Sequence, residues 1–117
     1  MIELPILICT TDDGTFCKAH SISRAECEME PIDVRNGIWR AFDASGAPLK
    51  LLVTKTPTAI GLFTFERVSI LEDERPPKEA PNIRQELAAY LHEIGAGGDE
   101  LYRQTFRELL AFVHALD

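Results

Sequence analysis

Residues 49–71 constrain the fold of this chain more than any other segment. They read LKLLVTKTPTAIGLFTFERVSIL, and apolar residues, many of them β-branched or aromatic, dominate the stretch. Pro57 lies near the middle, and because proline has a fixed φ and no amide proton, a strand cannot run straight through it. The segment therefore predicts two strands, at about residues 49–55 and 59–71, that fold back on each other.

A second hairpin is predicted at the start of the chain. Residues 4–11 are apolar on both faces of a predicted strand, which is typical of a central strand in a sheet. The dipeptide Asp13-Gly14 follows, and both residues tolerate the positive φ of a tight hairpin turn. We therefore expect a return strand over residues 15–22.

Further turn signals continue this pattern. Asn36-Gly37 is typical of a hairpin turn and predicts that a strand at residues 31–35 pairs with one at residues 38–43. Another turn, rich in small residues, leads into the next strand. Because successive strands pair locally, residues 4–71 are expected to form an antiparallel meander of five or six strands.

Residues 23–30 fit two structures. Ser23 and Glu26 have the spacing of a helical capping box. Apolar and acidic residues nevertheless alternate strictly, as in a strand, with Ala25, Cys27 and Met29 on one side and Glu26, Glu28 and Glu30 on the other. We favour the strand, because Pro31 leaves little length for a helix. The strand predicts an acidic ladder of three glutamates on one exposed face.

The last third of the chain is predicted to be helical. Residues 72–80 (EDERPPKEA) are charged and proline-rich, which indicates a linker between sheet and helices. Asn82, with Gln85 three residues later, can cap a helix over residues 82–94, along which apolar residues recur at helical spacing. A glycine-rich link ends that helix, and a second helix is expected over residues 99–116.

Together these elements predict a single α+β domain over residues 1–117. An N-terminal antiparallel β-meander of five or six strands is followed by a C-terminal antiparallel two-helix hairpin packed on one face of the sheet. The strand at 59–71 is apolar on both faces, with Phe63, Phe65 and Leu71 on one and Leu62, Val68 and Ile70 on the other. Two helices cover only one face. The second face is closed by sheet curvature, by the N-terminal strands or by another molecule, which keeps a homodimer among the alternatives.

The charge of the chain bears on its partners. The net charge is −7 and the pI is about 4.9, and the basic residues are dispersed singly. We expect no nucleic-acid partner, because such a surface repels phosphate backbones. The same charge favours a basic protein partner, or simply keeps a small protein soluble.

The sequence also bears on the compartment. No segment approaches the roughly 18 apolar residues of a membrane helix, and the start of the chain lacks the basic region of a signal peptide. Three cysteines, an odd number, do not make a closed set of disulfides. We therefore expect a cytoplasmic protein with free thiols and no membrane contact.

The candidate partner-binding residues are four acidic side chains, one tryptophan and one arginine in the first forty positions. Paired carboxylates run acid–base chemistry only in a pocket that separates their pKa values, and an exposed ladder lacks such a pocket. The acidic cluster is therefore expected to be a solvated face or a contact for a basic partner. Tryptophan and arginine are frequent interface anchors, although tryptophan is also frequent in cores. The candidate set is Glu26, Glu28, Glu30, Asp33, Trp39 and Arg40.

An alternative site would use thiol and imidazole side chains, in a pocket near Cys17, His20 and His92. Cys17 and His20 are three residues apart, which on a strand places them on opposite faces and argues against a thiolate–imidazole pair. For a zinc site, Cys17 and His20 are the only close pair of ligands, and Cys9 and Cys27 stand alone, whereas zinc ligands usually come as close pairs on tight turns. We therefore expect no metal site and no cofactor.

These observations favour a small, acidic, cytoplasmic module for protein–protein interaction without enzymatic activity. Such a module is expected to act as an inhibitor or immunity-type binder of a basic partner. The alternative is a small-molecule-binding or catalytic domain with its pocket between the sheet and the helices.

Overall fold

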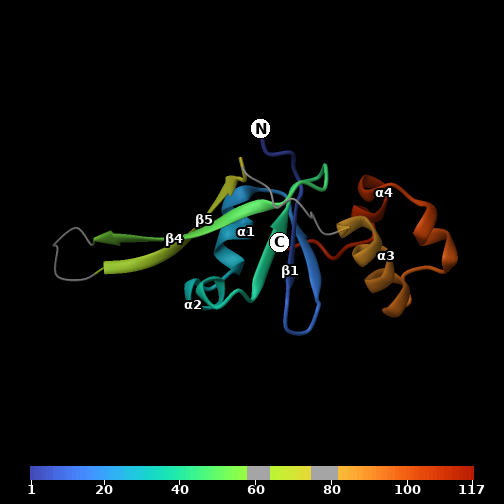
Figure 1. Cartoon of the computed structure of the whole chain (residues 1–117), viewed down its shortest axis with the longest axis horizontal. Helices are drawn as coiled ribbons and strands as arrows, with labels where there is room; N and C mark the ends of the chain where they lie inside the picture. Colours follow the sequence, from blue (N-terminus) through green and yellow to red (C-terminus); the bar gives the residue numbers. More distant parts are fainter. Residues whose placement is uncertain (58–63, 75–81) are drawn as a thin grey trace.

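The computed structural model describes residues 1–57, 64–74 and 82–117, which form a mixed α+β fold with two antiparallel sheets (Figure 1). The first sheet has the order β2-β1-β3 and contains β1 (Ile6–Thr10), β2 (Phe16–Ala19) and β3 (Trp39–Phe42). The second sheet is a hairpin of β4 (Leu49–Pro57) and β5 (Thr64–Glu72).

The prediction of one continuous meander is wrong for the described residues, whose five strands are divided between two sheets. The division falls between β3 and β4, where an isolated bridge joins Phe42 of β3 to Pro48, the residue before β4. Proline has no N–H to donate to a ladder, so pairing does not continue from this point.

β1 is the central strand of the first sheet, and its two faces point into different cores. Ile6 and Ile8 lie in one core, Leu7 and Cys9 lie in the other, and all four side chains are fully buried. The predicted central position of the first apolar run is therefore confirmed. Its predicted hairpin is confirmed too, since β2 pairs with β1 across a turn in which Gly14 has a φ of +70°.

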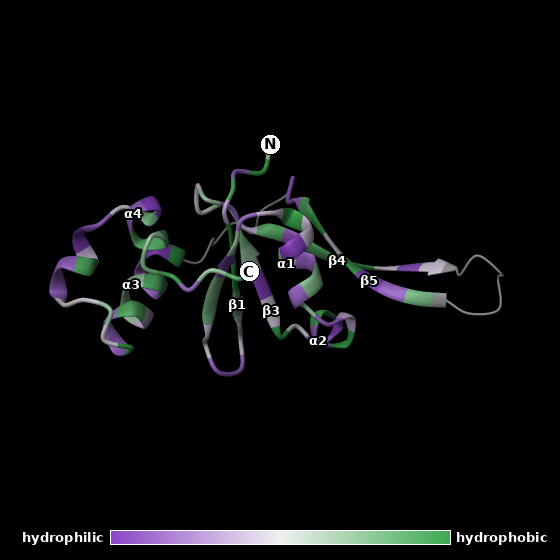
Figure 2. Ribbon diagram, turned by 180° about the vertical axis from the view of Figure 1, so that it is seen from behind, coloured by the Kyte–Doolittle hydropathy of each residue, from purple (hydrophilic) through white to green (hydrophobic). Residues whose placement is uncertain are grey.

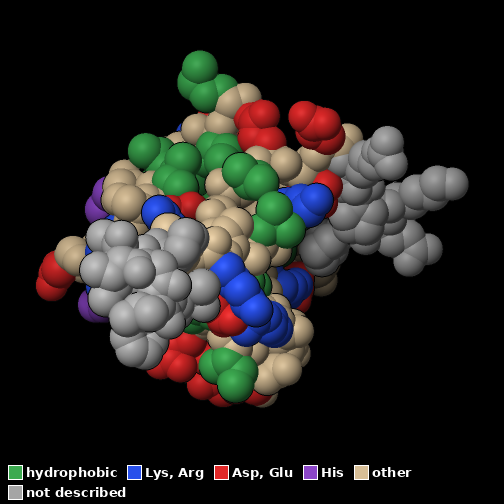
Figure 3. Space-filling view, turned by 90° about the vertical axis from the view of Figure 1, so that its left-hand side faces the viewer, with side chains coloured by type: hydrophobic (Ala, Val, Ile, Leu, Met, Phe, Trp, Pro, Cys, Tyr) green, Lys and Arg blue, Asp and Glu red, His purple; other side chains and the backbone are tan. Residues whose placement is uncertain are grey.

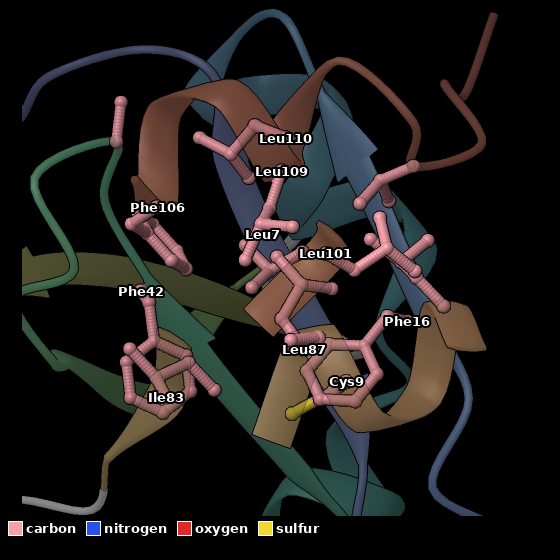
Figure 4. Packing of buried hydrophobic residues seen from close by; sticks show 14 residues of the cluster. Leu7, Cys9, Phe16, Phe42, Ile83, Leu87, Leu101, Phe106, Leu109 and Leu110 are labelled. Carbon is pink, nitrogen blue, oxygen red and sulfur yellow. The ribbon is translucent and has the colours of Figure 1, made fainter. Parts of the chain in front are cut away.

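Three helical elements cover the Leu7 face of the first sheet (Figure 1). They are α3 (Ile83–Glu93), the 3₁₀ helix η1 (Asp99–Arg103) and α4 (Phe106–Leu110). Each element contributes a leucine to this core, and Figure 4 shows Leu87, Leu101 and Leu109 gathered near Leu7. This core is closed entirely by apolar packing of helices on the sheet.

The helix predicted over residues 82–94 is confirmed by α3. The side chain of Asn82 accepts a hydrogen bond from the backbone N–H of Gln85 at 3.2 Å, which is the expected cap. Of the linker predicted at residues 72–80, β5 includes Glu72, and residues 75–80 lie outside the described residues.

The continuous helix predicted over residues 99–116 is wrong. Thr105 and Glu108 form a capping box that begins α4 after η1 has ended, so two short helices replace one long one. Beyond α4 the chain runs beside β2, where Leu116 N donates to Lys18 O at 2.8 Å. The C-terminal segment is therefore tied to the first sheet by backbone hydrogen bonds.

The strand predicted at residues 23–30 is wrong, because the chain forms a helix there, α1 (Ile22–Glu28). Its N-cap is Ser21, whose hydroxyl accepts a backbone hydrogen bond from the first turn of the helix. Ala25 and Met29 are four residues apart and both are buried, so the alternating pattern also satisfies a helical face.

The strand predicted at residues 31–35 is also wrong, because this segment is a short helix, α2 (Pro31–Arg35). Pro31 is the first helical residue, a position where the missing N–H would have no helical acceptor in any case. Asn36-Gly37 ends this helix, with Gly37 at a φ of +70°, and leads into β3. The turn signal is real, but it joins a helix to a strand.

The β4–β5 hairpin projects from the body of the molecule on the side away from α3 and α4 (Figures 1 and 2). Its antiparallel register is unbroken along both strands, which confirms the predicted pairing as far as it is described. Leu62 and Phe63, which belonged to the predicted second strand, lie outside the described residues.

The two faces of β5 differ in burial. Val68 and Ile70 are buried in the core that also contains Ala25 and Met29, so α1 covers this face. The expectation that the C-terminal helices cover it is wrong, because those helices pack on the first sheet. The opposite face of β5 exposes two large apolar side chains, Phe65 and Leu71.

Candidate functional site

A groove of about 370 Å³ lies between α1 and β5. The two elements are neighbours in the fold (Figures 1 and 2). We call it the α1–β5 groove, and its lining residues are Ser23, Glu26, Cys27, Met29, Glu30, Pro31, Phe65, Glu66, Arg67 and Val68. Its volume is within the range of ligand-binding pockets, about 300–1,000 Å³.

One wall of the groove is a face of α1. Ser23, Glu26 and Cys27 are separated by three and four residues, which places them on one side of a helix. Ile22 and Ala25 pack into the core, and this packing sets the rotation of the helix about its axis. Because the apolar side of α1 packs in the core, its polar side faces the groove.

The other wall of the groove is formed by the edge of β5. Four consecutive residues line it, and because successive side chains of a strand point to opposite faces, such a run lines a groove only along the strand edge. Phe65 is 53% exposed, whereas Val68 is 3% exposed. The β5 wall therefore begins at the exposed ring of Phe65 and ends at Val68, which is part of the core.

Hydrogen bonds hold two carboxylates of the groove in place. Glu26 Oε2 accepts from the backbone N–H of Ile70 at 2.7 Å. Glu66 accepts two hydrogen bonds from the Arg35 guanidinium, at 2.5 and 2.6 Å. These two bonds lower the pKa of Glu66 below its ordinary value and raise the pKa of Arg35. Glu66 is therefore ionised and already paired.

Glu30 and Arg67 carry the remaining charges of the groove. Both are exposed, and the side chain of neither forms a hydrogen bond or an ion pair with another residue in the described ranges. Figure 3 views the molecule from the end where the hairpin projects, and it shows acidic, basic and apolar side chains intermingled. The groove thus offers one unpaired carboxylate beside α1 and one unpaired guanidinium beside β5.

The structure divides the predicted acidic cluster. Glu26 and Glu30 line the groove, whereas Glu28 forms an ion pair with Arg24 at 3.1 Å and does not line it. Asp33 is half-buried on α2 and also lies outside the lining. The predicted ladder on one face is wrong, because residues two apart in a helix point about 200° away from each other.

Trp39 and Arg40 lie on opposite faces of β3 and outside the α1–β5 groove. Arg40 packs over the Phe42 ring at 5.6 Å and forms an ion pair with Glu86 of α3 at 3.2 Å. Trp39 packs against the core on the α1 side. Its indole N–H is buried and has no acceptor in the part of the chain that is described. Both residues line a second groove, of about 390 Å³, between β3 and β4.

The residues of the alternative pocket are not brought together. Cys17 packs on the α1 side of the first sheet, where burial and the nearby Glu28 carboxylate raise its pKa to about 11. His20 is exposed after β2. His92 is exposed on α3, which covers the other face of the sheet, and its Nε2 lies 3.6 Å from Asp99 Oδ1.

Apolar side chains fill the space between the first sheet and the C-terminal helices (Figure 4). Within residues 1–57, 64–74 and 82–117, no three His, Cys, Asp or Glu side chains gather closely enough to hold a metal ion.

Of the groove residues, the candidate set contained only Glu26 and Glu30, and sequence reasoning also missed the contact between Glu26 and Ile70. The lining residues that it missed are Ser23, Cys27, Met29, Pro31, Phe65, Glu66, Arg67 and Val68. The spacing of Ser23, Glu26 and Cys27 was the one local signal of a helical groove wall. The contribution of β5 depends on tertiary packing, since its residues are about forty positions away from α1.

No protein-family model matches this chain, and searches of curated proteins and of solved structures find no significant match. Among the described residues, every helix is too short or too polar to cross a membrane.

Proposed function

We propose that this protein is a protein-interaction module that holds a basic segment of a partner protein in the α1–β5 groove. One observation carries the proposal. The groove combines an apolar floor of Met29 and Val68, an exposed aromatic ring at Phe65, and the carboxylates of Glu26 and Glu30. Apolar burial supplies affinity, and unpaired charge at the rim selects the partner.

The charge of the molecule supports a basic protein as the partner. The net charge of −7 attracts cationic proteins and disfavours phosphate backbones. Glu30 is exposed and unpaired in the described chain, so it can meet a lysine or arginine without first losing an internal partner. An inhibitor or immunity-type protein would act in this way, by occupying a basic surface of its target.

We propose binding rather than catalysis, in the cytoplasm. The groove is lined by three carboxylates, one guanidinium and one thiol, without an imidazole to exchange protons near neutral pH. All three cysteines are free thiols, which suits a reducing compartment.

Selection from a random-sequence peptide library, with the purified full chain as the target, tests the proposal. Selected peptides are expected to combine lysine or arginine with apolar residues. The tightest synthetic peptide is then measured by fluorescence polarisation against the native chain and the Glu30→Gln variant. Because a charge pair is lost, the variant is expected to bind about fivefold more weakly.

Glu28→Gln is the matched control. It makes the same change in net charge two residues away, at the end of α1, but at a residue outside the groove. We expect its affinity to stay within about twofold of the native value. Equal losses in the two variants, selected peptides without basic residues, or a selection that returns no binder would each overturn the proposed function.

A second candidate is self-association through the outer face of β5. Phe65 and Leu71 are 53% and 46% exposed on that face, and exposed apolar side chains of this size favour burial between two copies. Sedimentation velocity at micromolar concentration tests it. A dimer that the Phe65→Ser variant abolishes supports the candidate, and a monomer at all concentrations removes it.

A further inference from the structure

The edge of β5 that faces α1 carries backbone groups without partners in the described residues. In an antiparallel pair, the N–H and C=O groups of alternate residues point toward the partner strand and away from it. The N–H of Ile70 points away from β4, since it donates to Glu26. Because the register is unbroken, Val68 and Glu66 present their N–H and C=O groups on the same side.

Glu26 closes this open edge at one end. Its carboxylate oxygen lies 2.7 Å from the N–H of Ile70, in the place that the carbonyl oxygen of a neighbouring strand would take. Val68 and Glu66 both line the α1–β5 groove, and no hydrogen bond within the described residues occupies the edge at these two positions. An unpaired strand edge is a template for a further strand.

We infer that the partner segment binds as an extended strand that pairs with the β5 edge at Glu66 and Val68 and places a basic side chain between Glu26 and Glu30. This inference rests on the proposed function, and it names the binding mode at the same groove. Main-chain hydrogen bonds to the edge provide affinity, and alternate side chains of the added strand provide specificity.

Charge complementarity selects the composition of that strand. Beside α1, Glu30 is unpaired, and the second oxygen of Glu26, Oε1, has no hydrogen-bond partner in the described ranges. Arg67 lies on the β5 wall and repels a uniformly cationic segment. The complementary sequence therefore alternates basic residues with apolar or acidic ones. This alternation is the pattern that a strand displays on its two faces.

A helix in the same groove would match the structure less well. A helix satisfies its own backbone groups, so the N–H and C=O groups of Val68 and Glu66 would stay unpaired beside it. A buried unpaired backbone group is destabilising, and an added strand avoids this cost by pairing with it.

A backbone N-methylation scan of the selected peptide tests the inference on the native full chain. Each backbone nitrogen of the synthetic peptide is methylated in turn, and the affinity is measured by fluorescence polarisation. Methylation removes one N–H and adds bulk at the strand edge. Strand addition predicts losses of about tenfold at every second position of the contact segment and about twofold or less between them.

The outcomes separate this inference from the proposed function. If every methylated peptide keeps its affinity while binding still depends on Glu30, strand addition is overturned and the proposed function stands. Losses at several consecutive positions also overturn strand addition. Binding that does not depend on Glu30 overturns the proposed function itself, and the inference with it.

Discussion

The buried carboxylate of Asp43 holds two separate segments of the chain together through hydrogen bonds. It is 5% exposed, and it accepts hydrogen bonds from Ser45 N at 2.9 Å, Ser45 Oγ at 2.5 Å, Ala47 N at 3.2 Å and Glu3 N at 3.3 Å. Burial alone would raise the pKa of Asp43, but these hydrogen bonds outweigh it and hold the pKa below its ordinary value. The carboxylate thereby ties the start of the chain to the turn before β4.

Asp43→Asn is expected to lower the free energy of unfolding at neutral pH by about 1–3 kcal/mol, because an amide cannot accept all of these bonds. A carboxyl group with a lowered pKa in the folded state stabilises the protein above its ordinary pKa of 3.8. That stabilisation is lost as the pH falls through the folded-state pKa. Urea denaturation should therefore show the gap in free energy of unfolding between native and variant narrowing as the pH falls from about 5 through the folded-state pKa. A constant gap would contradict the role of the charge.

The three cysteines differ in reactivity for reasons that the structure supplies. Cys9 is buried, Cys17 is half-buried and Cys27 is exposed in the groove. Burial raises the pKa of Cys9, and burial with the neighbouring Glu28 raises the pKa of Cys17 to about 11. The thiolate is the reactive form, so a raised pKa slows alkylation.

A maleimide at pH 7.5 is expected to modify Cys27 well before Cys17 or Cys9, as peptide mapping by mass spectrometry would show. A bulky label there should also abolish binding of the selected peptide, because the label occupies the groove. Cys27→Ser should keep its affinity within about twofold, since the thiol itself makes no required contact. Labelling of Cys17 at an equal rate would contradict the assigned burial.

At the scale of the element, α1 shows how a cap and a buried face outweigh an alternating pattern. The Ser21 hydroxyl accepts a hydrogen bond from Arg24 N at 3.1 Å. This cap begins the helix at Ile22, before the alternating residues 25–30. Ala25 and Met29 then meet the core, and Glu26 reaches β5. The helix positions one wall of the groove.

Ser21→Ala is expected to lower the free energy of unfolding by about 1 kcal/mol, because the helix loses its cap. Ser23→Ala is the matched control, two residues away, and it is expected to stay within about 0.5 kcal/mol. Urea denaturation followed by circular dichroism measures both. Had Ser23 been the cap, as the capping-box spacing suggested, the order of the two effects would be reversed.

At the scale of the whole molecule, β1 joins two cores. Its alternate residues belong to the core beneath α3 and to the core beneath α1 and β5. β2 and β3 likewise place Phe16 and Phe42 in the first core and Ala19 and Ala41 in the second, so the whole first sheet couples the two cores. This arrangement favours a single cooperative transition, as expected for a small domain.

Leu87→Ala tests this coupling, since Leu87 is fully buried in the core beneath α3. The substitution is expected to lower the free energy of unfolding by about 2–5 kcal/mol. Trp39, the single tryptophan, packs against the other core, so its fluorescence reports that core. The fluorescence transition should shift as far as the circular dichroism transition. A tryptophan signal that keeps its native midpoint would show that the two cores unfold separately.

Local signals in the sequence determined the elements whose structure depends on neighbouring residues. The apolar run of β1 and the turn at Gly14 define the first hairpin, and Asn82 begins α3. The strong apolar runs of β4 and β5 likewise pair as expected across the described residues. Long runs with a single period, or turns that need a positive φ, leave few alternative structures.

Only the tertiary structure decided residues 22–35 and the groove. A short alternating segment satisfies either period, and the free energy of burying Ala25 and Met29 against β5 selects the helix. The same packing brings Glu26 to Ile70, 44 positions along the chain, and places Glu30 beside an open strand edge. Residue types determine which segments can be apolar walls or polar rims. The pairing of α1 with β5 depends on burial between residues far apart in the chain, and no local sequence pattern encodes this pairing.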